Sequence, residues 1–232
     1  MMDATDVAVV TGASRGIGEA TARRLAADGY QVVAAARTAA ELERLAIDTP
    51  GVTPCTMDVA SDVDVARLAT TADELGRLQV WVNNAAILVP TRFAALDLVA
   101  WRETMSVDLD GVFLGCHQAY RRMTSGGGGV IVNIASLSGV VHVEKFPGLA
   151  AYNVAKAGVI ALTEAVALEG RDRGVRCMCL SPGAVATAML ERANPRLQTE
   201  MAPHDIAAII AFLVRPEAAW LSGTNIPIFS NA

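Results

Sequence analysis

The sequence predicts a single α/β domain in which helices cover both faces of a parallel β-sheet. Short apolar runs alternate with longer amphipathic stretches from one end of the chain to the other. The short runs are apolar throughout, which indicates strands that are buried on both faces. Neither a shift in composition nor an internal repeat divides the 232 residues, so we expect one domain, 1–232.

Seven of the apolar runs have the length of strands. They occupy residues 7–10, 31–35, 53–57, 80–83, 130–134, 175–180 and 226–228. The helical stretches between them occupy residues 18–27, 39–47, 63–75, 96–124, 150–171 and 203–214. Right-handed crossovers then predict a doubly wound, Rossmann-type three-layer sandwich with a seven-stranded parallel sheet.

Composition and charge argue against several classes of function. Hydrophobic residues make up 53% of the chain and charged residues 19%, which is enough apolar material for a large core. The net charge of −5 and the lack of a long basic run argue against a nucleic-acid partner. No run approaches the roughly 18 apolar residues of a membrane span, and residues 1–6 do not resemble a signal peptide. We therefore expect a cytoplasmic protein without a membrane partner.

The four cysteines do not have the spacing of a metal site. Cys177 and Cys179 are two residues apart in an expected strand and should face the same side of the sheet. We expect all four to be buried free thiols in a reducing compartment, and we expect no bound metal.

The first expected strand leads directly into a glycine-rich turn that opens a helix. Residues 11–18 read Thr-Gly-Ala-Ser-Arg-Gly-Ile-Gly. Glycine permits the tight turn and lets backbone N–H groups approach a pyrophosphate, although a tight turn without a ligand is the alternative. The expected cofactor contacts in this turn are Gly12, Ser14, Arg15, Gly16, Ile17 and Gly18.

The end of the second strand bears on the choice between NADP and NAD. Folds that bind NAD usually carry an acid about 20 residues after the glycines, but here Ala36 and Arg37 stand in that region. Arg37, with help from Arg15, suits a 2′-phosphate and therefore favours NADP over NAD. The alternative is a surface arginine that closes a strand.

Polar residues also follow the third and fourth strands. Asp58, with Val59 beside it, is placed to accept a hydrogen bond from an adenine amino group, and the alternative is that it caps the helix that starts near Ser61. Asn84 is expected to tie neighbouring strand ends together. Ala85 is small enough to let a ring lie against the backbone.

Tyr152 and Lys156 are four residues apart on an expected helix, so they project from the same face. A fixed ammonium favours an ionised phenol, so the pKa of Tyr152 is expected to fall from about 10 toward the working pH. Tyr152 is thereby a candidate general acid/base for proton transfer at a carbonyl or hydroxyl oxygen. For the pair alone, a packed Tyr beside a solvated Lys is the alternative.

Taken together and in this order, the motifs resemble those of the short-chain dehydrogenase/reductase family over almost the whole chain. The turn at 11–18, Asn-Asn-Ala-Ala at 83–86 and Tyr152-x-x-x-Lys156 are similar to its motifs, with Ala86 in place of the usual glycine. Ser136 stands where the family carries its catalytic serine. Residues 182–187 are similar to the family segment that closes over the nicotinamide. The resemblance implies cofactor contacts from Pro182, Gly183, Val185 and Thr187.

The resemblance implies an NADP-dependent oxidoreductase acting on a small carbonyl or secondary alcohol. It implies that Tyr152 exchanges the proton on the substrate oxygen, that Ser136 hydrogen-bonds that oxygen, and that Lys156 lowers the pKa of Tyr152 and binds the nicotinamide ribose. A dinucleotide-binding protein with weak or vestigial catalysis remains the alternative. A homodimer or homotetramer is expected, because the helix at 150–171 is apolar over much of its circumference.

Asp108 is the main departure from the family pattern. Many relatives carry a fourth catalytic residue, an Asn, in the sequence Val-Asn-Leu-x-Gly, whereas this chain reads Val-Asp-Leu-Asp-Gly at 107–111. A carboxylate there should stabilise the Lys156 ammonium, weaken its effect on Tyr152 and shift the pH optimum. The alternative is that Asp108 merely stabilises a bend in the helix.

Two further departures concern the substrate side, and a third concerns the cofactor side of the last expected strand. The interval from Ser136 to Tyr152 is slightly long for the family, so Ser138 is the alternative serine and the loop around His142 is expected to overhang the pocket. Residues 188–193 should form one short lid helix. The chain also ends without the Asp-Gly-Gly common in relatives.

Overall fold

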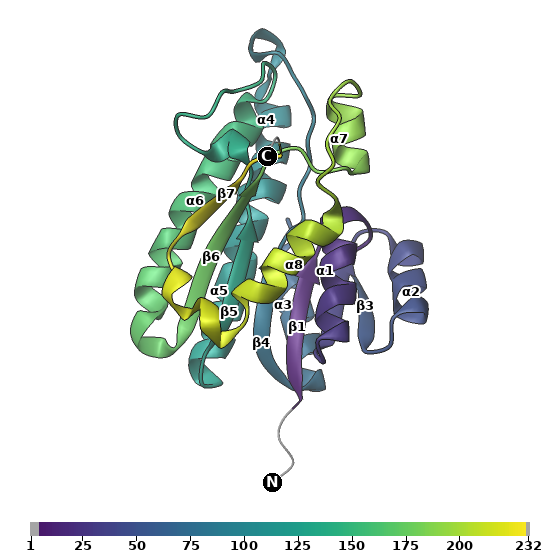
Figure 1. Ribbon diagram of the computed structural model, residues 1–232, viewed down its shortest axis with the longest axis vertical. Coiled ribbons are helices and arrows are strands. Elements are labelled where there is room, and N and C mark those ends of the chain that lie inside the picture. The colour runs from purple at the N-terminus through teal and green to yellow at the C-terminus, as the bar shows by residue number, and fades with distance from the viewer. Residues whose placement is uncertain (1–4, 231–232) are drawn as a thin grey trace.

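The computed structural model describes residues 5–230, and within them a seven-stranded sheet lies between two layers of helices (Figure 1). Its strands are ordered β3-β2-β1-β4-β5-β6-β7, and all neighbours run parallel. The predicted α/β, doubly wound, three-layer architecture is confirmed. Residues 1–4 and 231–232 lie outside the described residues, and the first four belong to the segment 1–6 that does not resemble a signal peptide.

Each predicted strand overlaps an observed one. Both edge strands contain a proline, Pro54 in β3 and Pro227 in β7, where a missing N–H disturbs the ladder least. The bounds are β1 Asp6–Thr11, β2 Gln31–Ala36, β3 Val52–Thr56, β4 Arg77–Asn83, β5 Gly129–Ile134, β6 Val175–Pro182 and β7 Asn225–Ile228.

Two hydrophobic cores form because successive strand residues point to opposite faces of the sheet. Ala8 and Val10 in β1 face the first core, and Val7 and Val9 face the second. The first core is covered by α1 Gly16–Ala27, α2 Ala39–Asp48 and α8 Pro203–Leu213. The second is covered by α3 Asp62–Leu75, α5 Gly111–Ser125 and α6 Ala150–Gly170.

The single helix expected over 96–124 is wrong. A 3-10 turn η1, Phe93–Ala95, precedes two α-helices, α4 Leu98–Met105 and α5, and these are joined by a π-helical turn η2, Ser106–Asp110. The periodicity of the sequence does not reveal this turn, because its wider spiral adds a residue without adding a breaker such as proline. The turn directs Asp108 into the interior, and such turns frequently mark functional sites.

The shorter elements complete the chain. The short lid helix expected at 188–193 is present as α7 Ala188–Ala193, which lies beyond the upper edge of the sheet in Figure 1. Three 3-10 turns were not predicted: η3 Leu137–Gly139, η4 Arg171–Arg173 and η5 Pro216–Leu221.

One helical stretch, Ala150–Arg173, is by length and hydropathy capable of crossing a membrane. It comprises α6 and η4. In this fold α6 packs along β6, and its buried residues Val159, Thr163 and Ala167 follow one face of the helix. One face of the stretch therefore packs against the sheet of the domain.

Helix α3 supplies a matched pair of positions for testing the core. Leu68 is fully buried, whereas Val63 is 71% exposed. We expect Leu68→Ala to lower the free energy of unfolding by about 2–5 kcal/mol, because it removes buried methyl groups and leaves a cavity. Val63→Ala should change it by less than about 0.5 kcal/mol. Urea denaturation of both variants measures the difference, and equal losses would contradict the assignment of α3 to the core.

Candidate active site

The strand order changes direction between β1 and β4, which lie side by side in the sheet. The chain builds β1, β2 and β3 outward on one side of this point, and β4 to β7 outward on the other. In open parallel sheets, ligands bind in the crevice beyond the carboxyl ends of the strands at such a point. The predicted site residues follow these carboxyl ends.

Asn84 fastens the glycine-rich turn to the end of β4. Its Nδ2 donates to the carbonyl oxygens of Thr11, at 2.9 Å, and Gly12, at 3.2 Å. The Thr11 hydroxyl oxygen accepts from the backbone N–H groups of Asn84, at 3.0 Å, and Ala85, at 3.2 Å. The predicted tie between strand ends is therefore present, and Thr11, which sequence reasoning did not select as a site residue, is half of it.

The glycine-rich turn fits a phosphate group. Gly12 has φ +66°, a left-handed conformation, and a Cβ on Gly18 would lie 2.3 Å from the carbonyl oxygen of Gly12. The turn can therefore be this compact only with glycine at both positions. No side-chain hydrogen bond caps α1 at Arg15, so the first N–H groups of the helix face the crevice without a side-chain acceptor.

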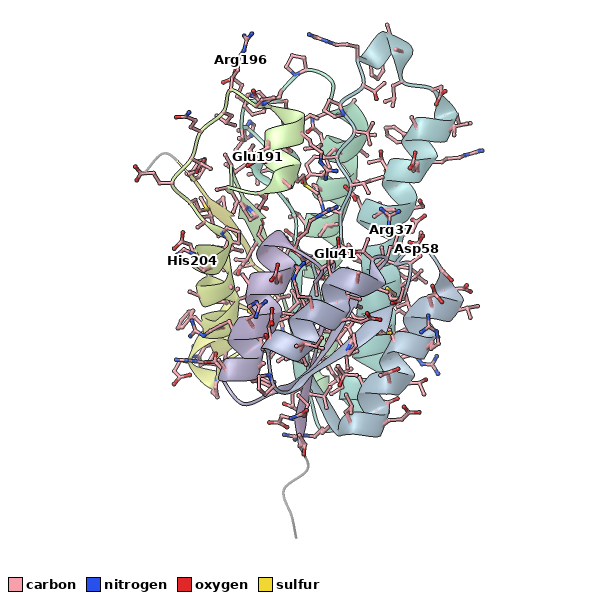
Figure 2. All side chains as sticks on the ribbon, turned by 90° about the vertical axis from the view of Figure 1, so that its right-hand side faces the viewer. Arg37, Glu41, Asp58, Glu191, Arg196 and His204 are labelled. Atoms are coloured by element: carbon pink, nitrogen blue, oxygen red, sulfur yellow. The ribbon has the colours of Figure 1, made fainter. Side chains whose placement is uncertain are left out.

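Arg37 and Asp58 follow neighbouring strands, as Figure 2 shows. Arg37 is exposed at the end of β2, and Arg15 is exposed at the start of α1. The Asp58 side chain accepts from the backbone N–H of Ala60 at 3.0 Å, whereas Ser61 caps α3. The alternative role of Asp58 as the cap of α3 is therefore wrong.

Tyr152, Lys156 and Ser136 come together where α6 crosses the end of β5. The Lys156 ammonium is 1% exposed and donates to the carbonyl oxygen of Ile134, the last residue of β5, at 3.2 Å. Its Nζ lies 5.5 Å from the centre of the Tyr152 ring. The Ser136 hydroxyl lies near enough to the Tyr152 phenol to lower its pKa, whereas Ser138 donates its backbone N–H to Ser136 Oγ at 3.1 Å. Of the two candidates for the catalytic serine, the geometry thus favours Ser136 over Ser138.

Two residues that sequence reasoning missed position Ser136. A Cβ on Gly139 would lie 2.5 Å from the carbonyl carbon of Lys156, so glycine lets η3 pack directly on the backbone of α6. The Lys145 ammonium donates to the carbonyl oxygens of Leu137, at 3.2 Å, and Val140, which closes the loop after η3. The glycine three residues after Ser136 was a visible signal for the first contact. No local sequence pattern signals the second contact, the one made by Lys145.

The expected fall in the pKa of Tyr152 is wrong for the cofactor-free protein. Burial raises the pKa of Tyr152 above its ordinary value, because a phenolate would lose its hydration. The Lys156 charge and the nearby Ser136 hydroxyl lower the pKa of Tyr152, whereas the Asp108 charge raises it. The effect of burial is the largest of the four.

Asp108 lies against this group from the π-helical turn. Its side chain is 0% exposed, and Oδ1 accepts from the backbone N–H of Ile87, beyond β4, at 2.8 Å. Burial raises the pKa of Asp108, while the Lys156 charge and the Ile87 N–H lower it. The carboxyl group therefore bonds across to another element and does not merely stabilise the bend in its own helix.

The segment after β6 is clamped from two sides. Gly183 donates its N–H to Ile228 O at 2.8 Å, and Ser230 Oγ accepts from the Ala184 N–H at 3.2 Å. On the other side, the Thr199 hydroxyl donates to Ala184 O at 3.1 Å. Ser230 thus supplies a contact at the chain end that lacks Asp-Gly-Gly. The other predicted residues of this segment are Pro182, Val185 and Thr187, and Thr187 caps α7.

A small enclosed pocket of about 30 Å³ adjoins Tyr152. Its walls come from the loop after β4, from α4 and from residues 148–151, and they include Val89, Leu96 and Thr104. A larger open depression of about 720 Å³ lies between α3 and α5 near the amino end of β4. None of the predicted site residues lines it, so we place the site at the carboxyl edge.

The ionisation of Tyr152 is measurable without cofactor. We expect Lys156→Met and Ser136→Ala each to raise the pKa of Tyr152 further, because each removes a group that now lowers it. Ultraviolet titration of the phenols measures this, and loss of one titrating group in Tyr152→Phe identifies the signal. An unchanged or lower pKa of Tyr152 in Lys156→Met would contradict the described geometry.

Comparison with known proteins agrees with the geometry. The family model described as short chain dehydrogenase matches residues 6–198. A 3-oxoacyl-(acyl-carrier-protein) reductase of Synechocystis sp. is 40% identical, covering 94% of this chain and 92% of the relative. A 3beta-hydroxysteroid dehydrogenase 1 of Eggerthella lenta is 36% identical, covering 94% and 90%.

A solved structure matches the fold closely. A crystal structure described as ribose-5-phosphate isomerase from Brucella melitensis 16M has a TM-score of 0.89 and 34% identity, covering 97% of this chain and 90% of that one. A meso-2,3-butanediol dehydrogenase of Serratia marcescens is also 34% identical over 97% of this chain and 94% of the relative. The chain therefore belongs to the short chain dehydrogenase family, whose enzymes act on alcohol and carbonyl groups with nicotinamide cofactors.

Proposed function

We propose that the protein is an NADP-dependent oxidoreductase that interconverts a carbonyl compound and a secondary alcohol, with Tyr152 as the general acid/base. The observation that carries this proposal is the meeting of Tyr152, Ser136 and Lys156 at the carboxyl edge of the sheet. The glycine-rich turn, which fits a phosphate group, opens onto the same edge.

The three side chains have separate tasks in this mechanism. The nicotinamide supplies or accepts the hydride when the cofactor is bound. During reduction, Tyr152 gives its phenolic proton to the carbonyl oxygen as negative charge develops there. The Ser136 hydroxyl donates a hydrogen bond to the same oxygen and orients it. The Lys156 ammonium stabilises the tyrosinate that remains, because an opposite charge nearby favours the ionised phenol.

NADP is the proposed cofactor, because no acid stands at the end of β2, where Arg37 is exposed, and Arg15 is exposed at the start of α1. A guanidinium pairs well with a 2′-phosphate. The residues that would hold the cofactor are Gly12, Ser14, Arg15, Gly16, Ile17, Gly18, Arg37, Asp58, Val59, Asn84, Ala85, Tyr152, Lys156, Pro182, Gly183, Val185 and Thr187.

The proposed substrate is a small molecule, and the protein is proposed to be cytoplasmic. The relatives named above act, by their names, on an acyl thioester, a steroid and a diol, so membership of the family leaves the substrate open. Assembly as a homodimer or homotetramer is supported by exposed apolar side chains on α5 and α6, Phe113 at 51% and Leu168 at 64% exposure.

A dinucleotide-binding protein with vestigial catalysis is the second candidate. One observation favours it: the family's Asn is replaced by Asp108, a buried acid that raises the pKa of Tyr152. A higher pKa of Tyr152 leaves a smaller fraction of it ionised at neutral pH, so less tyrosinate is available as the base for alcohol oxidation. Turnover of NADPH with a panel of ketones and aldehydes decides between the two candidates.

Removal of the Tyr152 hydroxyl tests the mechanism. We expect Tyr152→Phe to lower kcat/KM by about 10²–10⁴-fold, the usual contribution of a general acid, while NADPH still binds in a fluorescence titration. Tyr120→Phe is the control, because the Tyr120 hydroxyl bonds Glu169 O at the surface. Full activity in Tyr152→Phe would refute the assignment.

The cofactor preference rests on Arg37. We expect Arg37→Ala to weaken NADPH binding by about 10–100-fold, the loss of a charge-assisted hydrogen bond, and to leave NADH binding nearly unchanged. Arg44, exposed on α2, provides the control variant Arg44→Ala. Tighter binding of NADH than of NADPH by the wild-type protein would overturn the NADP assignment.

A further inference from the structure

The segment that follows Ser136 is folded around the ammonium group of Lys145. Lys145 Nζ donates to the carbonyl oxygens of Leu137, at 3.2 Å, and Val140. Both oxygens also accept a backbone N–H: the Val140 N–H bonds Leu137 O at 3.1 Å, and the Val143 N–H bonds Val140 O at 3.5 Å. An ammonium carries three N–H groups and makes stronger hydrogen bonds than a neutral donor, so it can serve both oxygens at once. Lys145 thus ties the loop back onto η3, the turn that begins it.

The loop that Lys145 closes contains a strained residue. His142 has φ +64°, and within residues 5–230 it is the one non-glycine residue with a positive φ. A left-handed conformation is unfavourable for a residue with a side chain and persists only where the surrounding structure enforces it. The side chains of Val141, His142 and Glu144 are exposed, so burial does not enforce it here. The hydrogen bonds of the Lys145 ammonium are therefore what keeps this loop in its strained form.

The far end of the loop is tied to the wall of the small pocket beside Tyr152. The Thr91 N–H donates to Gly148 O at 2.9 Å, which joins the loop to the segment after β4. Thr91, Gly148 and Tyr152 all line the pocket of about 30 Å³. Because Lys145 lies between Ser136 and Gly148 along the chain, its hydrogen bonds connect the position of the Ser136 hydroxyl to that of the pocket wall.

We propose that Lys145 is a positioning residue for the reaction: its ammonium holds η3 and residues 140–148 together as one rigid piece and so keeps the Ser136 hydroxyl aimed at the substrate oxygen. This proposal rests on the proposed function, in which Ser136 orients that oxygen. Lys145 acts through Ser136 and does not itself touch the reacting atoms. It lies outside the motifs shared with the family, in the interval between Ser136 and Tyr152 that is slightly long for that family.

Removal of the ammonium tests the proposal during turnover. Lys145→Met keeps an unbranched side chain but loses the charge and every N–H donor. We expect kcat for NADPH-dependent reduction of the best carbonyl substrate to fall by about 10–100-fold, because a small misplacement of an orienting group has an effect of this size. The Kd of NADPH should not change, since Lys145 is not among the residues proposed to hold the cofactor. Glu144→Gln, at the exposed neighbouring position, is the control and should keep the wild-type kcat.

The ammonium can also be restored chemically in Lys145→Cys. The four native cysteines are buried, so 2-bromoethylamine should alkylate the introduced thiol at the exposed position 145. The thiolate displaces bromide, and the resulting S-aminoethyl side chain has the length and the charge of lysine. We expect kcat to recover by about tenfold or more over the untreated variant. Wild-type protein treated in the same way is the control, and no recovery after alkylation that mass spectrometry shows to be complete would contradict the proposal.

The Tyr152 phenol reports the position of Ser136 without cofactor or turnover. The Ser136 hydroxyl lowers the pKa of Tyr152, and the charges that act on this phenol are those of Lys156 and Asp108. We expect Lys145→Met to raise the pKa of Tyr152, as Ser136→Ala does, because the hydroxyl moves away from the phenol. In a protein that already carries Ser136→Ala, Lys145→Met should cause no further rise. Ultraviolet titration of the wild type, both single variants and the double variant measures this.

The two readouts separate the possible failures. A wild-type kcat in Lys145→Met, or an unchanged pKa of Tyr152, would overturn the proposal. The same rise in pKa with and without the Ser136 hydroxyl would also overturn it, because Lys145 would then act by another route. A merely structural role would lower the Tm of Lys145→Met and leave the pKa of Tyr152 as it is. If the wild type reduces no carbonyl compound with either cofactor, the proposed function fails, and the titration still decides whether Lys145 positions Ser136.

Discussion

The hydrogen bond from the buried Lys156 ammonium to the end of β5 is the contact on which the geometry of the site depends. Its acceptor is Ile134 O, at 3.2 Å, and Ser136 follows two residues later on the same chain segment. Tyr152 stands one helical turn before Lys156 on α6. An ammonium buried without an acceptor is strongly destabilising, so this bond sets how α6 lies against β5. Gly139 then allows η3 to pack on α6 at the same place.

A buried polar network between β4, β5 and α6 supports the contact between Lys156 and Ile134. Trp81 Nε1 donates to Asn83 Oδ1 at 2.8 Å, Asn83 Nδ2 donates to Asn133 Oδ1 at 2.8 Å, and Asn133 Nδ2 donates to Thr163 Oγ1 at 2.9 Å. The network joins β4, β5 and α6 across the second core. A buried network with these groups satisfied permits few other arrangements, so it holds the helix that carries Tyr152 at a defined position on the sheet.

Within residues 5–230, Asp108 departs from this pattern of satisfied polar groups, as does Asn153, whose Oδ1 also lacks a hydrogen-bond partner. The π-helical turn places a carboxyl group in the interior with one oxygen unpartnered within residues 5–230, beside the lysine that the network helps to position. Such an arrangement is destabilising whenever the group is ionised. A buried polar group without a partner breaks a general rule of protein structure. Where the rest of the fold compensates for such a group, it tends to lie at a functional site. The Asp108 charge raises the pKa of Tyr152, the proposed general acid/base, so this departure lies at the candidate active site.

The sequence by itself determined the α/β fold, the glycine-rich turn and the spacing of Tyr152 and Lys156, because each is a local pattern of apolar period, glycine position or helical repeat. Only the tertiary structure decided that the helix breaks at η2, that burial outweighs Lys156 in setting the pKa of Tyr152, and that Ser230 contacts the segment after β6. Ile87 and Asp108 are 21 positions apart, and Ala184 and Ser230 are 46 apart. Contacts and burial of this kind depend on packing between distant segments, which a local pattern does not encode.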